Sequence, residues 1–109
     1  SYKQTISNTF SSLANTITED DFLFVWVMSH GGTDANGSYF YSNDNQKVYD
    51  SELATWLGNI AAHKKMVFLS FPNSGGFLPE LEVDGSIVIT AGGAAEVVSK
   101  VEELKKMFF

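Results

Sequence analysis

The chain has 109 residues, of which 44% are hydrophobic and 14% aromatic, so we expect one packed domain and exclude a disordered chain. Its formal charge is −6, all seven basic residues are lysines, and without a basic stripe we expect no nucleic-acid partner. It contains no cysteine, which excludes disulfides and a thiol nucleophile within these residues. The longest apolar run, residues 22–28, is too short to span a membrane.

Two amphipathic or apolar segments open the chain. Apolar residues recur at helical spacing between Ile6 and Ile17, which predicts a helix over residues 4–17 with one buried face. Residues 22–28 are apolar at every position, which indicates a strand covered on both faces.

The middle and end of the chain alternate strands with helices. Residues 38–42 and 47–49 predict a small β-hairpin. We expect a helix to follow, capped by Asp50 or Ser51 and with positive charge from residues 63–65 at its C-terminal end. This helix leads to a strand at 66–71. His63 in this segment is interpreted as structural. We expect a loop at 78–85, a strand at 86–90 and a final helix at 94–109. The pattern predicts an α/β fold with a mostly parallel sheet, helices on both faces and right-handed crossovers.

Two of the predicted strands end in the same way, with polar residues followed by paired glycines. The first is followed by His30-Gly31-Gly32, and the strand at 66–71 is followed by Pro72 and the sequence Ser74-Gly75-Gly76. Carboxyl ends of parallel strands meet at one edge of a sheet, where open α/β sheets place their sites. We therefore expect His30 and Pro72 to lie at a common edge.

These motifs resemble the caspase-fold cysteine peptidases, a group that includes caspases, metacaspases and legumain. The resemblance implies a three-layer caspase-like, Rossmann-like fold, with His30 at the position of the catalytic histidine and Gly31 donating to the oxyanion. Aligned on Ser74-Gly75-Gly76-Phe77, the position of the family's nucleophilic cysteine is held by Pro72. Pro72 follows His30 by 42 residues, close to the spacing of roughly 50 in caspases.

The resemblance extends to the end of the chain, with departures. Thr90-Ala91 and Glu96 match the segment that lines the substrate pocket in legumain-like members, while valines replace its serines, so the implied substrate-binding positions are Glu96 and Val98. The chain has no arginine, on which the caspase preference for aspartate depends. Strands that the family places before residue 4 are missing, so we expect residues 1–109 to be one caspase-like domain that is a fragment or one chain of the full fold.

Three functions are compatible with these residues. The first is a caspase-like domain without peptidase activity, which binds a peptide or protein and uses no metal or cofactor. The second is an active hydrolase that uses Ser70 or Ser74, or in which the alignment of Pro72 is wrong. The third is a flavodoxin-like domain that binds a small ligand. The missing strands also predict an open edge on the strand at 22–28, to which a second copy or a companion chain pairs.

Overall fold

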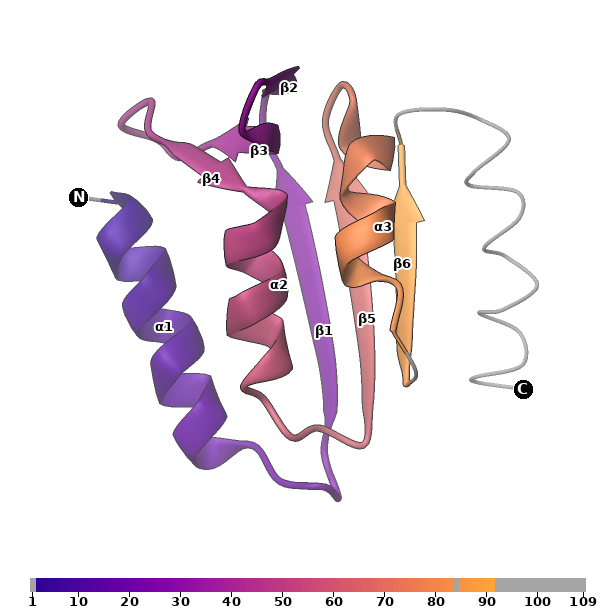
Figure 1. Ribbon diagram of the computed structural model, residues 1–109. Coiled ribbons are helices and arrows are strands. Elements are labelled where there is room, and N and C mark those ends of the chain that lie inside the picture. The colour runs from indigo at the N-terminus through magenta and orange to yellow at the C-terminus, as the bar shows by residue number, and fades with distance from the viewer. Residues whose placement is uncertain (1, 84, 92–109) are drawn as a thin grey trace.

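The computed structural model describes residues 2–83 and 85–91 (Figure 1). Helices and strands alternate along most of this length, with a group of short strands between the first strand and the second helix. In chain order the elements are α1 (Tyr2–Thr16), β1 (Phe22–Met28), β2 (Gly31–Asp34), β3 (Gly37–Tyr41), β4 (Lys47–Tyr49), α2 (Asp50–Gly58), β5 (Lys64–Ser70), η1 (Ser74–Phe77), α3 (Leu78–Leu81) and β6 (Ser86–Thr90).

The main sheet is parallel and has the strand order β1-β5-β6 among the described residues. Val25 of β1 pairs with Val67 of β5, which in turn pairs with Val88 of β6. The predicted parallel arrangement of these three strands is confirmed. With the antiparallel hairpin sheet and the helices, it also confirms the predicted α/β fold class.

The second sheet is antiparallel, with the order β2-β3-β4. The sequence predicted only two strands here and left the Gly31-Gly32 pair in a loop, which is wrong, because this pair begins β2. Asp34 pairs with Gly37, so a tight turn joins β2 to β3, and Gly37 adopts a φ of +127° that favours glycine. The Asn36 N–H donates to Asp34 Oδ1 at 2.8 Å and closes the turn.

The helices lie in front of the parallel sheet in Figure 1, and the core fills the space between the layers. Phe10 of α1 stacks on Trp56 of α2 with 5.6 Å between ring centroids, which joins these two helices. The buried apolar side chains of this core are Phe10, Phe40, Val48, Leu53, Leu57, Ile60, Val67, Leu69, Phe71, Phe77, Leu81 and Val88.

Helix α2 begins and ends earlier than the sequence indicated. Its N-cap is Tyr49 rather than Asp50 or Ser51, and the Tyr49 N–H donates to Glu52 Oε1 at 3.1 Å. The helix ends at Gly58, and Lys65 lies in β5 instead of near a helix end. Lys65 Nζ nevertheless reaches back and donates to the Leu57 carbonyl at 2.6 Å.

Among the residues that the structure describes, strand β1 is covered on one face only, whereas the sequence predicted cover on both faces. Leu23, Val25 and Val27 pack against the core, whereas every second residue of the strand, Phe24 and Trp26 among them, is exposed. The uniformly apolar sequence could not reveal this alternation. The helix predicted at 94–109 lies outside the described residues.

The segment after β5 is helical where the sequence predicted a loop. The short helices η1 and α3 follow one another, Pro79 lies in the first turn of α3 where no intrahelical N–H is needed, and Phe77 and Leu81 are buried. None of the helices within the described ranges is long and apolar enough to cross a membrane.

Candidate functional site at the carboxyl edge of the parallel sheet

The two loops singled out in the sequence meet at one edge of the sheet. Met28 and Ser70 are paired at the carboxyl ends of β1 and β5, and the Ser29 N–H donates to the Ser70 carbonyl at 3.4 Å. His30 is the second residue after β1 and Pro72 the second residue after β5, and both are exposed. The structure therefore brings together the two positions that the sequence predicted at a common edge.

Gly31 lies close against the loop that carries Pro72. A Cβ atom added at Gly31 would lie 2.6 Å from Cδ2 of Phe71, 2.6 Å from the Tyr39 carbonyl oxygen and 3.1 Å from the Pro72 carbonyl oxygen. Two of these neighbours are backbone atoms, which cannot rotate away as a flexible side chain can. The absence of a side chain at Gly31 is thus what allows β2 to pass against the end of β5.

The pairing of β2 with β3 leaves the N–H of Gly31 outside the ladder. Gly31 is opposite Phe40, and the flanking bond from the Tyr41 N–H to the His30 carbonyl, 2.9 Å, makes this a non-hydrogen-bonded pair. In such a pair the N–H groups point away from the neighbouring strand. Gly31 can therefore offer its N–H to a bound group.

Pro72 is the second residue of a tight turn. The Ser74 N–H donates to the Phe71 carbonyl at 3.2 Å, and Asn73, the third residue, has φ +64° and ψ 18°. Proline at the second position and a positive φ at the third are the signature of a type II turn. The second residue of such a turn needs no N–H for the turn itself, so other amino acids fit there as well.

The two serines considered as alternative nucleophiles lie in different environments. Ser74 is fully buried, and among the described residues its hydroxyl has no hydrogen-bond partner. Ser70, the last residue of β5, is half-buried. A nucleophile must reach a substrate, so Ser74 cannot act without opening of its surroundings.

A polar cluster in the hairpin sheet was missed by the sequence reasoning. Asp34 Oδ2 accepts hydrogen bonds from Lys47 Nζ at 2.9 Å and from the Tyr49 hydroxyl at 2.8 Å. These two hydrogen bonds lower the pKa of Asp34 from 3.8 to about 2, and the bond from Lys47 has the larger effect. Lys47 Nζ also lies 4.5 Å from the centre of the Tyr39 ring. The alternation of tyrosines along β3 was the signal that could have indicated this shared face.

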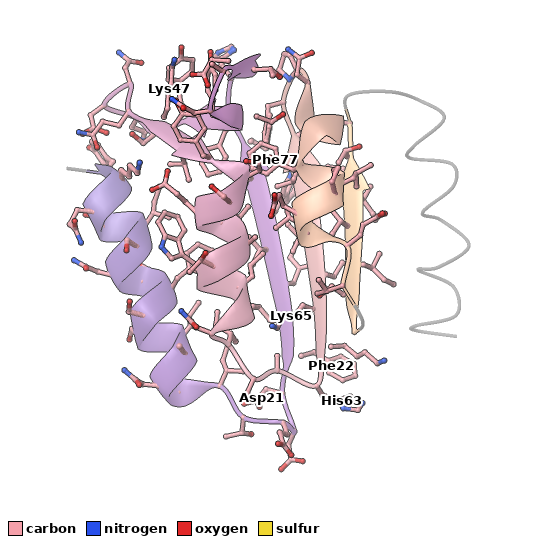
Figure 2. The ribbon with its side chains drawn as sticks, in the orientation of Figure 1. Asp21, Phe22, Lys47, His63, Lys65 and Phe77 are labelled. Carbon is pink, nitrogen blue, oxygen red and sulfur yellow. The ribbon has the colours of Figure 1, made fainter. Side chains whose placement is uncertain are left out.

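Figure 2 shows how the labelled residues divide between the two ends of the sheet. Lys47 and Phe77 lie towards the carboxyl edge, whereas Asp21, Phe22 and His63 lie at the opposite end. The His63 ring stacks on Phe22 with 5.6 Å between centroids, and the backbone N–H of His63 donates to the Asp21 carbonyl at 2.7 Å. These contacts agree with a structural role for His63, away from the candidate site.

Two further expectations concern metals and the substrate pocket. Across residues 2–83 and 85–91 there is no group of three or more histidine, aspartate or glutamate side chains that could hold a metal ion. Glu96 and Val98, the implied substrate-binding positions, lie outside the described residues, so their role stays a prediction.

A parallel α/β sheet, a small antiparallel sheet inserted after its first strand, and histidine and glycine-rich loops at one edge are consistent with the class of caspase-like peptidase-fold proteins. More particularly, the chain belongs to the Peptidase C13 family, whose model matches residues 3–100. Membership of this family excludes the alternative of a flavodoxin-like domain. No curated protein and no solved structure gives a significant match to the chain.

Proposed function

We propose that this member of the Peptidase C13 family is a binding module without peptidase activity, which takes a peptide or protein segment at the edge formed by His30, Gly31 and Pro72. One observation carries the proposal. The 109 residues contain no cysteine, so a thiolate nucleophile is absent whichever residue is aligned with the family's cysteine.

The chemistry of the edge supports the same conclusion. In caspase-fold peptidases a thiolate attacks the carbonyl, a histidine protonates the leaving amine, and two backbone N–H groups hold the oxyanion. Pro72 supplies neither a thiol nor an N–H. The loss of one oxyanion donor alone lowers the rate about a hundred- to a thousandfold.

The groups that remain are suited to binding. The Gly31 N–H lies outside the β2–β3 ladder and can donate to a peptide carbonyl, while the exposed His30 imidazole offers a second polar contact. The contact with the Phe71-Pro72 segment fixes the backbone at Gly31. A segment in extended conformation presents the carbonyl groups that these donors require.

Restoration of the missing groups tests the proposal. Pro72→Cys introduces a thiol and a backbone N–H at a turn position that accepts other residues. We expect the unmodified chain to resist a thiol-directed peptide probe, such as a peptidyl acyloxymethyl ketone, and the Pro72→Cys variant to be labelled in a peptide-dependent manner. Adding His30→Ala to Pro72→Cys should slow labelling, because the imidazole no longer assists formation of the thiolate.

Pro72→Ser is the matched control, since it restores the N–H but supplies a much weaker nucleophile. Its labelling should stay at background, which separates the effect of the thiol from that of the turn. Robust peptide hydrolysis by the unmodified chain, abolished by His30→Ala, Ser70→Ala or Ser74→Ala, would instead show that a hydroxyl has taken over as the nucleophile.

A further inference from the structure

The outer edge of the hairpin sheet, beside Gly31, carries unpaired backbone groups. Strand β2 is an edge strand in the order β2-β3-β4, and Figure 1 shows it beyond the carboxyl end of β1. Gly31 and Phe40 form a non-hydrogen-bonded pair, and alternation along the strand makes Thr33 and Ser38 a second pair of this kind. The N–H and C=O groups of Gly31 and Thr33 therefore point away from β3.

This edge of β2 is open. No backbone group within residues 2–83 and 85–91 forms a hydrogen bond to the outward N–H and C=O groups of Gly31 and Thr33. Thr33 is exposed, and Gly31 and Gly32 have no side chains that could cover the edge. The strand also contains neither lysine nor proline, the residues that commonly block an open edge. A row of such backbone groups is a template for the addition of a strand.

The open edge begins at the candidate site. A Cβ atom at Gly31 would lie 3.1 Å from the Pro72 carbonyl oxygen, and His30 directly precedes β2. A strand advances by about 3.3 Å per residue, so an extended segment held at Gly31 reaches Thr33 two residues further on. Pairing with both residues allows about four main-chain hydrogen bonds, two at each residue. A segment bound at Gly31 therefore gains further bonds by continuing along β2.

The charges of β2 indicate which kind of segment fits. Asp34 is the one charged residue of the strand, and its carboxylate already accepts hydrogen bonds from Lys47 Nζ at 2.9 Å and from the Tyr49 hydroxyl at 2.8 Å. The edge thus offers main-chain donors and acceptors without an unpaired charge. A helical segment cannot use these groups, because its own backbone groups are already paired internally.

We propose that an extended, uncharged segment of a partner polypeptide pairs with the open edge of β2 and adds a fourth strand to the hairpin sheet. Its main chain exchanges hydrogen bonds with the N–H and C=O groups of Gly31 and Thr33. This pairing rests on the function proposed above, because the segment is the one taken at the edge formed by His30, Gly31 and Pro72. It specifies that the segment is recognised by its backbone.

Exchange of backbone N–H groups with water, measured by NMR, tests the pairing on the full 109-residue chain. The probe is the synthetic peptide acetyl-Thr-Val-Thr-Val-Thr-amide at millimolar concentration. As the probe approaches saturation, exchange at Gly31 and Thr33 should slow by about threefold or more. Exchange at Gly32 and Asp34 should change little, because their N–H groups already face β3. The same peptide with every backbone nitrogen methylated should give no protection.

A pair of variants at Thr33 separates the main chain from the side chain. Thr33→Pro removes the outward N–H at an edge position where proline is tolerated, so peptide affinity should fall at least severalfold. Thr33→Val keeps this N–H and should bind the peptide at least severalfold more tightly than Thr33→Pro. Equal affinity of the two variants would contradict a bond to the Thr33 N–H.

The outcomes distinguish this pairing from the function proposed above. Chemical-shift changes at His30 and Gly31 without slower exchange at Thr33 would overturn the pairing and leave peptide binding at the edge intact. Cleavage of the probe by the unmodified chain, detected by mass spectrometry, would refute the proposed function whether or not the alternating protection is seen. Slower exchange that arises without peptide and increases with protein concentration would also overturn the pairing, because the occupant would then be a second copy.

Discussion

Gly31 lies against the carbonyl group of Pro72, so closely that a Cβ atom at Gly31 would be 3.1 Å from the Pro72 oxygen. This contact joins the hairpin sheet to the end of the parallel sheet through backbone atoms. It fixes the distance between the loop that carries His30 and the loop that carries Pro72. The two loops are therefore held side by side by the backbone itself.

The first prediction concerns this contact. Gly31→Ala should lower the free energy of unfolding by about 1–3 kcal/mol, because the new methyl group meets two carbonyl oxygens that cannot move aside. Urea denaturation followed by circular dichroism measures the change. Gly58→Ala is the control: nothing lies within 4 Å of that position, which ends α2, so the variant should be unchanged or slightly more stable. Equal stability of Gly31→Ala and the original chain would contradict the close contact.

The sequence was sufficient to predict the parallel strands and the shared edge of His30 and Pro72, because short apolar runs ending in polar and glycine residues are local signals. It was insufficient for β1, whose seven residues are all apolar although alternate ones are exposed in the structure. Burial of a strand depends on what packs against each face, and that information is not local.

The second prediction concerns the buried hydroxyl of Ser74, which has no partner among the described residues. Ser74→Ala should leave stability unchanged or raise it by up to about 1 kcal/mol, since it removes an unsatisfied polar group. Ser42→Ala is the matched control, because the buried Ser42 hydroxyl donates to Asp44 and accepts from the Gln46 N–H. That variant should lose about 1 kcal/mol. A larger loss for Ser74→Ala than for Ser42→Ala would reveal a partner of the Ser74 hydroxyl.

The third prediction concerns the turn that carries Pro72. Asn73 has a φ of +64°, a conformation that costs residues with a Cβ atom about 1–2 kcal/mol. Asn73→Gly should therefore preserve or raise the thermal midpoint, while Asn73→Ala should lower it. Asn59→Gly is the comparison, because Asn59 has a φ of −83° and glycine only adds freedom to the unfolded chain there. A lower midpoint for Asn73→Gly than for Asn59→Gly would be inconsistent with the observed turn.

The hairpin sheet shows where sequence reasoning reaches its limit. The aromatic segments at 38–42 and 47–49 indicated a hairpin, but the bond between Asp34 and Tyr49 joins residues 15 positions apart. It depends on the register of three strands, which a single sequence does not determine. The contacts of Asp34 with Lys47 and Tyr49 could therefore be identified only from the folded structure.

The last prediction is the pH dependence of this cluster. Hydrogen bonds from Lys47 and then Tyr49 lower the pKa of Asp34 to about 2, below its usual value of 3.8. Folding therefore favours the ionised carboxylate, so its stabilising contribution is present above about pH 4 and is lost as the pH falls towards 2. NMR titration of the Asp34 carboxyl carbon should give a midpoint near 2. Tyr49→Phe should raise this midpoint, whereas Tyr41→Phe, which removes no bond to Asp34, should not. A midpoint near 3.8 in the original chain, unchanged by Tyr49→Phe, would refute the proposed network.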